Sequence, residues 1–469
     1  MPKQTSKPIR RFFHLTPPQT ITLSFAAMIL VGAFLLNLPL ASNDGQSVGF
    51  LNALFTATSA NCVTGLVVVN TRAHWTAFGK IVILLLIQLG ALGFISILTA
   101  SMILLKRRVS LRSRTVIQAA FNQGSVGGMV RLVKRVFVIT LAAEAIGALL
   151  LTVAFYADGD MSIGQAFCGG VFHAISAFCN AGFDIIGTES LTPYQGNVDI
   201  NMVIMALIMA GGLGFTVWGE LLARPKDHPR RSLRHRLAFL SLHTKIALTV
   251  TAALTLLGAG VFLLLEWRNP ATLGPMPPGT KLLAALFQSV TLRTAGFNSI
   301  SQGDLTDFSK IFSGILMFIG GSPAGTAGGI KTVTLGVILI AMLSALRGKD
   351  RMEAFGRTLP LELLQKALTV TGTLLAVVFG AAIILYFTEQ GSAYPHSTMD
   401  LLFESVSAAG TVGVSTGLTP HLSGAGKAVI TVCMFLGRLS PVTVVVALNM
   451  KMRATDDNIG YPEERVIIG

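Results

Sequence analysis

The sequence predicts an all-α integral membrane protein made of four tandem repeats, each a span, a pore loop and a second span. Three observations lead to this prediction. Charged residues make up only 12% of the 469 residues, about half the roughly 25% of a soluble domain. The charges are clustered, which leaves eight long apolar stretches, and four short segments between these stretches resemble one another. We therefore expect eight transmembrane helices and four re-entrant pore helices around one central pore.

Each of the eight apolar stretches is long enough to cross a bilayer, which takes about 20 apolar residues in a helix. Six stretches contain no Asp, Glu, Lys or Arg, and the other two contain one each, Glu144 and Arg438. The first stretch is too long for the apolar core of a signal peptide, and no small-residue cleavage site follows it. The stretches are residues 20–40, 81–105, 136–157, 200–219, 246–265, 311–330, 367–388 and 428–450.

The net charge of +14 is divided among alternate loops. Basic residues cluster before the first stretch and after the second, fourth and sixth, whereas the loops between them lean acidic. This alternation follows the positive-inside rule and predicts a multi-pass protein with both termini in the cytoplasm. A nucleic-acid binder would need one basic surface, so we expect no nucleic-acid partner. The four cysteines show no metal-ligand spacing, and no disulfide framework is expected.

Four short segments between the long stretches share one pattern. In each segment a Phe is followed four residues later by Ser or Thr, and a Gly follows the Phe by nine or ten residues. The Phe residues are spaced 117, 115 and 116 positions apart. Chance resemblance among apolar, Gly-rich segments is the alternative, but four matches at one spacing argue against it. We call them the glycine segments; they are residues 54–65, 171–182, 286–296 and 402–413.

The repeat unit is therefore a long span, a short re-entrant segment and a second long span. About ten residues rise only about 15 Å as a helix, half the hydrocarbon thickness, so each segment must dip in and return as extended chain. Backbone of this kind is tolerated at such depth only where protein buries it or water lines it. The predicted boundaries are 1–115 for the N-terminal tail and repeat 1, 116–235 for repeat 2, 236–350 for repeat 3, and 351–469 for repeat 4 and the C-terminal tail.

The glycines that end the four segments predict a constriction selective for a monovalent cation. Each short helix would aim its partially negative C-terminal end at the pore. Carbonyl oxygens replace a hydration shell in potassium filters, and glycine allows backbone angles closed to other residues. The predicted ion-binding residues are Val63, Thr64, Gly65, Asn180, Ala181, Gly182, Thr294, Ala295, Gly296, Thr411, Val412 and Gly413, with K⁺ at the four glycines.

These residues resemble the TrkH/KtrB family of bacterial potassium transporters, whose superfamily also includes the plant HKT transporters, and they are most similar to its KtrB members. The resemblance runs from Thr16-Pro17-Pro18-Gln19 to Tyr461-Pro462. It is most specific at Val63-Thr64-Gly65-Leu66, Asn180-Ala181-Gly182-Phe183, Arg293-Thr294-Ala295-Gly296-Phe297 and Thr411-Val412-Gly413.

The resemblance implies potassium uptake across the bacterial plasma membrane, with the four glycines as the selectivity filter. Glycine rather than serine at position 65 is similar to the potassium-preferring form. The family also implies a homodimer in membrane lipid, one pore per chain, and stimulation by Na⁺. The implied partner is a cytoplasmic RCK-type ring similar to KtrA, and nucleotides such as ATP or ADP would act only through that partner.

The stretch at 311–346 is nearly free of charge but too long for one transmembrane helix. As a helix it would reach about 54 Å, against a hydrocarbon core of about 30 Å. Its glycines and proline predict a break in the middle, with a kinked helix as the alternative. By resemblance to the family, the break is a gating loop below the filter, formed by Gly320, Gly321, Ser322, Pro323, Ala324, Gly325, Thr326, Ala327, Gly328, Gly329 and Lys331.

Ionisable residues inside apolar stretches are candidates for function because their burial in a membrane is unfavourable. By the resemblance, Arg438 is a barrier in the pore, and a structural salt bridge is the alternative. Arg293 and Glu404 are expected either to pair behind the filter or to bind local backbone groups. The sequence identifies no partner for Glu144, and His173 is interpreted as a packed polar residue.

Two other classes of function fit the sequence less well. A secondary transporter of another small cation or solute is the alternative, but many such proteins have inverted repeats and a midplane site at broken helices. Here the copies run in one direction, and only one long stretch is expected to be interrupted. A membrane enzyme is not expected, since no HExxH motif and no nucleotide-binding glycine motif in strand context is present.

Overall fold

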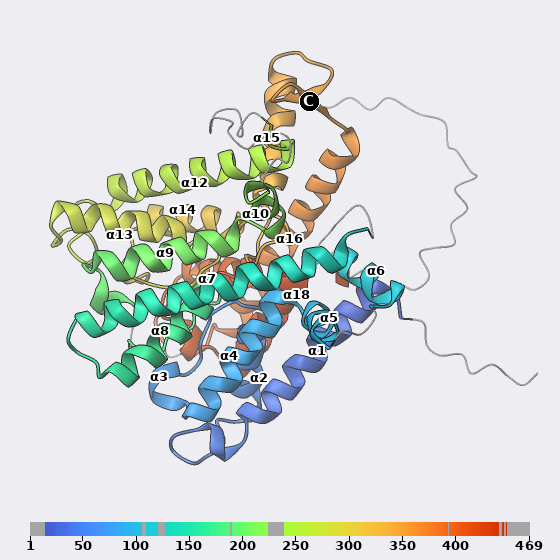
Figure 1. Ribbon diagram of the computed structural model, residues 1–469. Coiled ribbons are helices and arrows are strands. Elements are labelled where there is room, and N and C mark those ends of the chain that lie inside the picture. The colour runs from blue at the N-terminus through green and yellow to red at the C-terminus, as the bar shows by residue number, and fades with distance from the viewer. Residues whose placement is uncertain are drawn as a thin grey trace, which may run out of the picture.

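The computed structural model describes residues 15–105, 109–120, 127–187, 190–223, 239–392 and 394–439, together with residues 443, 444 and 447. These residues are mostly helical, with one two-stranded hairpin (Figure 1). Local sequence explains where helices begin. The first helix starts with proline after Thr16, which forms a capping box with Gln19. Side-chain oxygens cap several later helices, at Asn197, Ser241, Thr306 and Ser397.

The elements fall into four consecutive groups. The first contains α1 (Pro17–Leu36), η1 (Pro39–Ala41), α2 (Phe50–Asn61), α3 (Thr71–His74), α4 (Ala77–Leu92), α5 (Phe94–Leu104) and α6 (Leu111–Ala120). The second contains α7 (Met129–Ala157), α8 (Ile163–Phe178), η2 (Thr192–Tyr194), α9 (Val198–Gly212) and α10 (Phe215–Leu221). The third contains α12 (Leu242–Glu266), α13 (Pro278–Thr291), α14 (Asp307–Phe318) and α15 (Thr332–Leu346). The fourth contains the antiparallel strands β1 (Met352–Ala354) and β2 (Arg357–Leu359), then α16 (Leu361–Thr388), α17 (Thr398–Gly410), η3 (Thr419–His421) and α18 (Gly424–Leu439).

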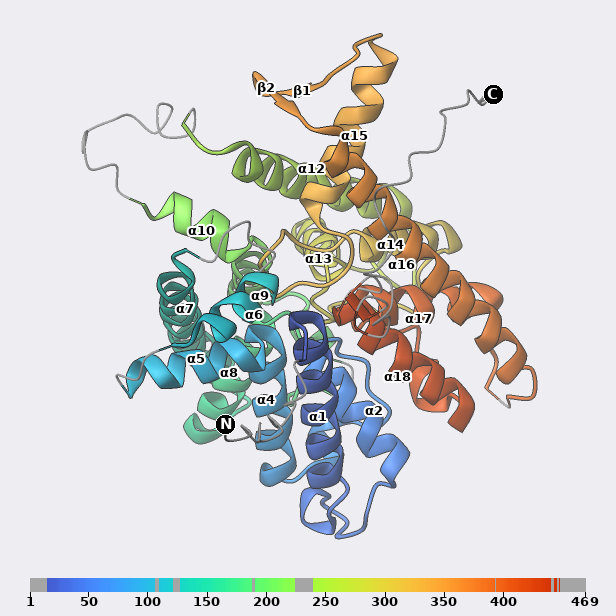
Figure 2. The same cartoon turned by 90° about the vertical axis from the view of Figure 1, so that its right-hand side faces the viewer.

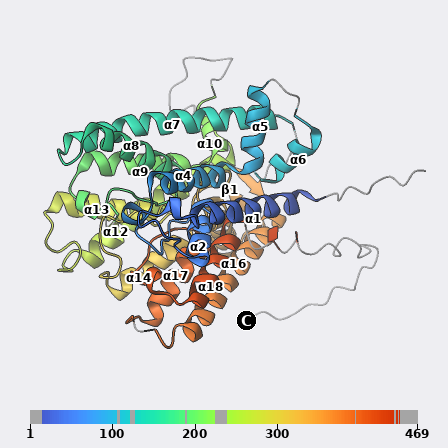
Figure 3. The same cartoon turned by 90° about the horizontal axis from the view of Figure 1, so that it is seen from below.

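The four groups are arranged about a common centre. Each short helix of a glycine segment packs on the first long helix of its own group: α2 on α1, α8 on α7, α13 on α12 and α17 on α16. The groups also contact one another in a closed cycle, α4 with α8, α9 with α13, α14 with α17, and α18 with α2. Figure 2 shows the groups around this centre. Figure 3 shows α18, drawn in red, near α2, drawn in blue.

The polarity of the surface and interior is that of a membrane protein. Among the described residues, the helices α1, α7, α12 and α16 are long and apolar enough to cross a bilayer, and the number rises to six if each of two bent helix pairs forms one span. Large apolar side chains on these helices are exposed, among them Phe34, Leu149, Leu264 and Phe387. The interior around the short helices instead holds buried serines, threonines and asparagines. A soluble protein rarely exposes so much contiguous apolar surface, so lipid is the solvent that fits this surface.

The expectation that only one long stretch is interrupted was wrong. The stretch at 81–105 bends by 94° between α4 and α5, and the stretch at 200–219 bends by 97° between α9 and α10. The bends lie at Gly93 and Gly214, whose φ values of 76° and 87° are closed to most residues with a Cβ. Each is the glycine of a Leu-Gly-Phe sequence, a signal that the periodicity of apolar residues does not reveal.

The expected break in the stretch at 311–346 is confirmed, because α14 ends at Phe318 and α15 begins at Thr332. The predicted span at 428–450 is described as a helix only to Leu439. The basic clusters at 3–11, 106–108 and 224–236, which predicted the orientation, lie outside the described residues, as does Tyr461-Pro462.

Candidate functional site

The four glycine segments end in the same backbone conformation. The residue two positions before each glycine has a positive φ: 57° at Val63, 61° at Asn180, 69° at Thr294 and 51° at Thr411. The glycines themselves have φ values of 98°, 68°, 86° and 92° in chain order. Residues with a Cβ rarely adopt positive φ, and such strain clusters at functional sites. The same unusual geometry therefore recurs at all four positions that the sequence singled out.

A buried hydroxyl group anchors each of these turns. Ser59 Oγ and Ser407 Oγ accept hydrogen bonds of 3.0 and 3.1 Å from the N–H groups of Gly65 and Gly413. Three hydroxyls donate to the carbonyl of the residue after the glycine: Ser176 to Phe183, Thr291 to Phe297 and Ser407 to Val414, at 2.8, 2.6 and 2.7 Å. These are the Ser and Thr residues four positions after the Phe of the shared pattern. That part of the pattern therefore marks the groups that hold the turns in place.

The glycines Gly65, Gly182, Gly296 and Gly413 form a ring. A Cβ placed on Gly65 would lie 2.5 Å from the carbonyl oxygen of Ala181, and one on Gly182 would lie 2.7 Å from that of Ala295. One on Gly296 would lie 2.7 Å from Val412 O, and one on Gly413 would overlap Thr64 O. Each glycine thus faces the carbonyl that precedes the glycine of the next segment. A side chain at any of these positions would enter the space between main chains.

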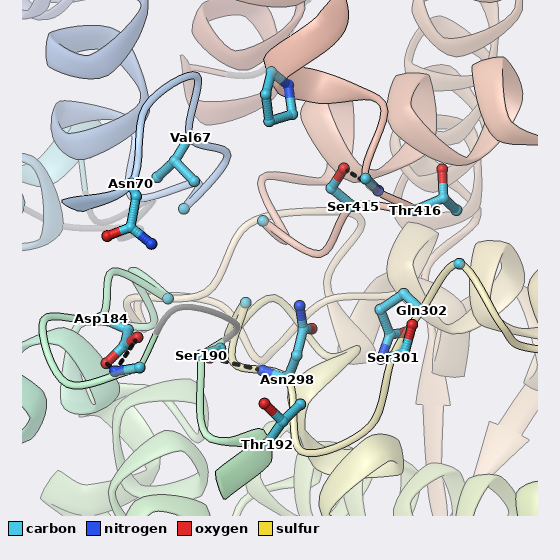
Figure 4. Close-up of a pocket in the computed structure, with 18 of the residues that line it drawn as sticks. Val67, Asn70, Asp184, Ser190, Thr192, Asn298, Ser301, Gln302, Ser415 and Thr416 are labelled. Carbon is cyan, nitrogen blue, oxygen red and sulfur yellow. Dashed lines mark hydrogen bonds between the residues drawn. The ribbon is translucent and has the colours of Figure 1, made fainter. Parts of the chain in front are cut away.

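An open pocket of about 310 Å³ leads to the ring from one side. All four glycines line the pocket, together with residues that follow each glycine segment in the chain. Figure 4 shows Val67, Asp184, Asn298 and Ser415, each two residues after one of the four glycines, around the same space. Asn298 N donates to Ser190 Oγ at 3.0 Å. This hydrogen bond connects the pocket wall of the second group with that of the third group.

The loop between α14 and α15 contacts the glycine segments from the opposite side. Thr326 Oγ1 lies 3.0 Å from Phe178 O and 3.2 Å from Asn180 Oδ1, and Gly328 N donates to Thr294 Oγ1 at 3.2 Å. A Cβ on Gly328 would lie 2.6 Å from Gly410 O and would also meet Thr411 Oγ1. The loop therefore reaches the positions two residues before the glycines in three of the four segments.

Two cationic side chains hold this loop through its carbonyl oxygens. Arg438 donates to Thr326 O at 2.5 Å and to Gly90 O at 2.9 Å, which joins α18, the loop and the end of α4. Lys331 Nζ donates to Ala327 O at 2.7 Å and to Gly328 O at 3.2 Å. No carboxylate lies within ion-pair distance of either cation among the described residues. The salt bridge considered for Arg438 is therefore absent from the described part of the chain.

The hypothesis that Arg293 pairs with Glu404 is wrong. Arg293 Nη1 donates to the carbonyl of Thr251 and to Thr255 Oγ1, both at 3.3 Å, on α12. Glu404 accepts hydrogen bonds from Thr419 Oγ1 at 2.5 Å, from Thr416 N at 3.1 Å and from the hydroxyl of Ser415. The alternative expectation, that each residue binds groups close to it, agrees with the structure. The physical reason is that each side chain finds hydrogen-bond partners within its own group of helices, so neither needs a partner from the neighbouring group.

Two residues left without a partner by the sequence have one in the structure. Glu144 Oε2 accepts from Gln88 Nε2 at 3.1 Å, and Glu144 Oε1 lies 3.7 Å from the thiol of Cys179. His173 Nε2 lies 2.8 Å from Asp184 Oδ1. Sequence reasoning passed over Gln88 and Asp184, although Asp184 follows Gly182 by only two residues.

Comparison with known proteins places this arrangement in a family. A family model described as the cation transport protein TrkH matches residues 16–458, nearly the whole chain. The chain belongs to the TrkH family of cation transport proteins. The resemblance inferred from the glycine segments is therefore confirmed.

Relatives of this TrkH-family chain are similar over almost their full length. The potassium/sodium uptake protein NtpJ of Enterococcus hirae is 41% identical over 460 residues, which cover 97% of this chain and 98% of NtpJ. The Ktr system potassium uptake protein B of Bacillus subtilis is 39% identical over 459 residues, 98% of each chain. The crystal structure of the potassium transporter TrkH from Vibrio parahaemolyticus superposes with a TM-score of 0.71 at 17% identity, covering 94% of this chain and 87% of that one. At 17% identity, the comparison with this structure supports a shared fold.

Proposed function

We propose that this TrkH-family chain takes up potassium through a channel-like pore with a four-glycine selectivity filter. The observation that carries the proposal is the ring of Gly65, Gly182, Gly296 and Gly413, each beside a main-chain carbonyl of the next segment at the end of an open pocket. Carbonyl oxygens in such a ring replace the hydration shell of a potassium ion. The four repeats predicted from the sequence would each contribute one segment, so that one chain holds one pore.

Unpartnered polar atoms near the ring support a lumen that holds water or a cation. Thr64 Oγ1, Asn180 Nδ2 and Thr411 Oγ1 are buried without a hydrogen-bond partner among the described residues. Buried polar atoms in proteins nearly always have a partner, so an ion or water that the pore holds would supply it. All three atoms belong to residues predicted to bind the ion.

The gating part of the proposal rests on the loop at 320–329 and on Lys331. The loop occupies the side of the ring opposite the pocket, where it would obstruct ions that have passed the filter. Arg438 would act as a barrier in two ways: it places a positive charge on the path, and it fixes the loop through Thr326. Uptake would require the loop to move away from Asn180 and Thr294.

The relatives suggest the setting of this activity. Two of them are named for potassium or potassium/sodium uptake, which supports K⁺ as the transported ion and Na⁺ as a second ion or stimulator. We further propose a homodimer in the bacterial plasma membrane with both termini in the cytoplasm. An RCK-type, KtrA-like ring would regulate it there, and nucleotide would act only through that ring. A secondary transporter of another small cation is the alternative, and it would not need four like-oriented carbonyl turns.

Ion flux in proteoliposomes tests the proposed function. The purified chain should carry K⁺ in preference to Na⁺, and addition of an RCK ring with nucleotide should change the rate. Expression should also restore growth of an uptake-deficient bacterium at low potassium. Flux of Na⁺ or a neutral solute without K⁺ flux would refute the proposal and favour the alternative.

A further inference from the structure

A lysine occupies the same helix position in three of the four groups of helices. Lys80, Lys310 and Lys427 are each the fourth residue of their helix, α4, α14 and α18 respectively. In two groups the ammonium reaches the first turn of the short helix in the next group of the closed cycle. Lys310 Nζ donates to Asp400 Oδ1 of α17 at 3.1 Å, and Lys427 Nζ donates to Asn52 Oδ1 of α2 at 3.2 Å. These two lysines therefore connect neighbouring groups.

The interface between the first and second groups lacks this connection. Gln165 of α8 is the third residue of its helix, the position that accepts the lysine in the other two groups. Its side chain accepts from Ser162 N at 3.1 Å at the start of its own helix. Within the described part of the chain, Lys80 makes no hydrogen bond to α8, and its Nζ donates to the carbonyl oxygen of Arg72 at 3.0 Å.

An open pocket of about 600 Å³ lies at this interface, where α4 contacts α8 (Figure 1). Arg72 and Lys80 line it from the first group, and Asp160 and Gln165 line it from the second. Gly187 lines this pocket and also the pocket that leads to the ring of glycines. The interface pocket therefore lies beside the entrance to the ring.

The charged groups of the interface pocket favour an anionic ligand. Arg72 and Lys80 give it two positive charges against the one carboxylate of Asp160. Neither cation has a carboxylate within ion-pair distance among the residues that the structure describes. Each donates to a main-chain carbonyl, Lys80 to that of Arg72 and the Arg72 guanidinium to that of Ile186. Since an ammonium has three donors and a guanidinium has five, both keep donors for the oxygen atoms of a phosphate group.

Apolar side chains beside the interface pocket indicate which kind of phosphate fits. Ile81 and Leu85 of α4, and Ile163 and Phe167 of α8, are each more than half exposed. Ile81 directly follows Lys80 in the chain. A free phosphate ion would leave these side chains without contact, whereas a phospholipid would cover them with its acyl chains. Basic side chains near a bilayer surface commonly bind lipid headgroups in this way.

We propose that the interface pocket between α4 and α8 binds the phosphate group of a phospholipid, with Lys80 and Arg72 as its ligands. The phosphate takes the place opposite Lys80 that the Asp400 carboxylate takes opposite Lys310. The acyl chains lie along the exposed apolar residues of α4 and α8. This site lies outside the ring of glycines, and lipid binding there does not depend on the proposed function.

Cys168 provides a readout that does not involve transport. It lines the interface pocket and is exposed, whereas Cys62, Cys179 and Cys433 are buried. A maleimide should therefore label Cys168 of the purified, delipidated chain in detergent. Dihexanoylphosphatidylglycerol at about ten times its Kd should slow this labelling about tenfold, by mass action. Dihexanoylglycerol, which has the same chains without phosphate, and inorganic phosphate, which has no chains, should leave the rate unchanged.

Replacing either cation should weaken the protection of Cys168. Lys80→Gln should raise the lipid concentration needed for half-protection about tenfold, as expected for the loss of one hydrogen bond from a charged donor. Arg72→Gln should have a similar effect and serves as the second variant if Lys80→Gln does not fold. Lys427→Gln is the matched control, because Lys427 has the same helix position but contacts Asn52. Its half-protection concentration should equal that of the wild type.

Three results would overturn the proposal. Protection by dihexanoylglycerol as strong as by the phospholipid would exclude a phosphate site, and equal protection by inorganic phosphate would exclude a lipid site. Wild-type protection in both Lys80→Gln and Arg72→Gln would exclude these two ligands. Native mass spectrometry gives a second measurement: the chain purified without delipidation should retain a phospholipid that Lys80→Gln loses. A chain that moves no potassium but shows this protection would refute the proposed function and support the lipid site.

Discussion

Arg438 donates a hydrogen bond of 2.5 Å to the carbonyl oxygen of Thr326, which ties the last described helix to the loop between α14 and α15. The two residues are 112 positions apart and lie in different groups of helices. The same guanidinium binds the carbonyl of Gly90 at the end of α4. One side chain thus fixes the loop against two other parts of the molecule, and four predictions about the pore follow from this region and from the ring above it.

Replacing Arg438 with Gln should raise potassium flux. Glutamine is too short to reach Thr326 and Gly90 together, and it removes the positive charge. A hydrogen bond to a charged group contributes about 1.5–3 kcal/mol, so release of the loop should raise the flux about tenfold or more. Proteoliposome uptake measures the change.

Arg135→Gln is the matched control for Arg438→Gln. Arg135 donates to the carbonyl of Gly219 at 3.5 Å, between α7 and α10, and makes no hydrogen bond to the described residues of the loop. Its flux should stay near the wild-type value. Equal increases in both variants would mean that a general loosening, rather than the loop, sets the rate.

Deleting residues 321–328 should increase flux at least as much as Arg438→Gln does. The deletion removes Thr326 and Gly328, which contact Asn180 and Thr294. Size-exclusion chromatography should first establish that the shortened chain folds. A folded deletion variant with unchanged flux would contradict the gating assignment.

Replacing Gly65 with Ser should reduce discrimination between K⁺ and Na⁺. The Cβ would lie 2.5 Å from Ala181 O, and a φ of 98° is unfavourable for any residue with a Cβ. Strain of about 1–3 kcal/mol at this turn should shift the carbonyls and lower the K⁺/Na⁺ flux ratio about tenfold. Gly380→Ser in α16 is the control, because no atom lies within 4 Å of the added Cβ. Unchanged selectivity in Gly65→Ser would count against the filter.

Replacing Ser407 with Ala should also lower the K⁺/Na⁺ flux ratio. The hydroxyl accepts from Gly413 N and donates to Val414 O, and its loss leaves two buried main-chain groups unpaired. An unpaired buried group costs about 1–3 kcal/mol, enough to loosen the fourth turn.

Ser405→Ala provides the comparison for Ser407→Ala within the same helix. Ser405 is equally buried, but its hydroxyl donates to Leu401 O inside α17. Its flux ratio should match the wild type. A loss of selectivity in Ser405→Ala as large as in Ser407→Ala would show that helix packing, and not the turn anchor, is responsible.

The glycine segments could be located from the sequence because each carries several signals at one spacing. Phe, Ser or Thr, and Gly recur together. The structure gives the four glycines a common backbone conformation, and each of the four hydroxyl groups forms a hydrogen bond within its own turn. The break between α14 and α15 was also predictable, since a charge-free stretch longer than a bilayer, with a proline among its glycines, does not remain one helix. The bends at Gly93 and Gly214 were not, because Gly90 and Gly211 in the same stretches look no different in the sequence and yet pack inside the helices α4 and α9.

The partners of buried polar side chains were beyond the reach of the sequence. Arg293 binds Thr251 and Thr255 of α12, and Glu144 binds Gln88, 56 positions earlier in the chain. Spacing along the chain does not say which helix faces which. A charged residue in an apolar stretch therefore indicates that a polar partner exists, but the sequence does not identify that partner.

The sequence by itself determined the membrane setting, the family and the positions of the four glycine segments, because hydropathy, charge clustering and a repeated pattern are properties of the chain alone. Only the tertiary structure decided that each glycine faces the carbonyl of the next segment, that Arg438 holds Thr326, and that His173 meets Asp184. The physical reason is range: a helix or turn is set by residues a few positions apart, whereas these contacts depend on which surfaces of distant segments pack together.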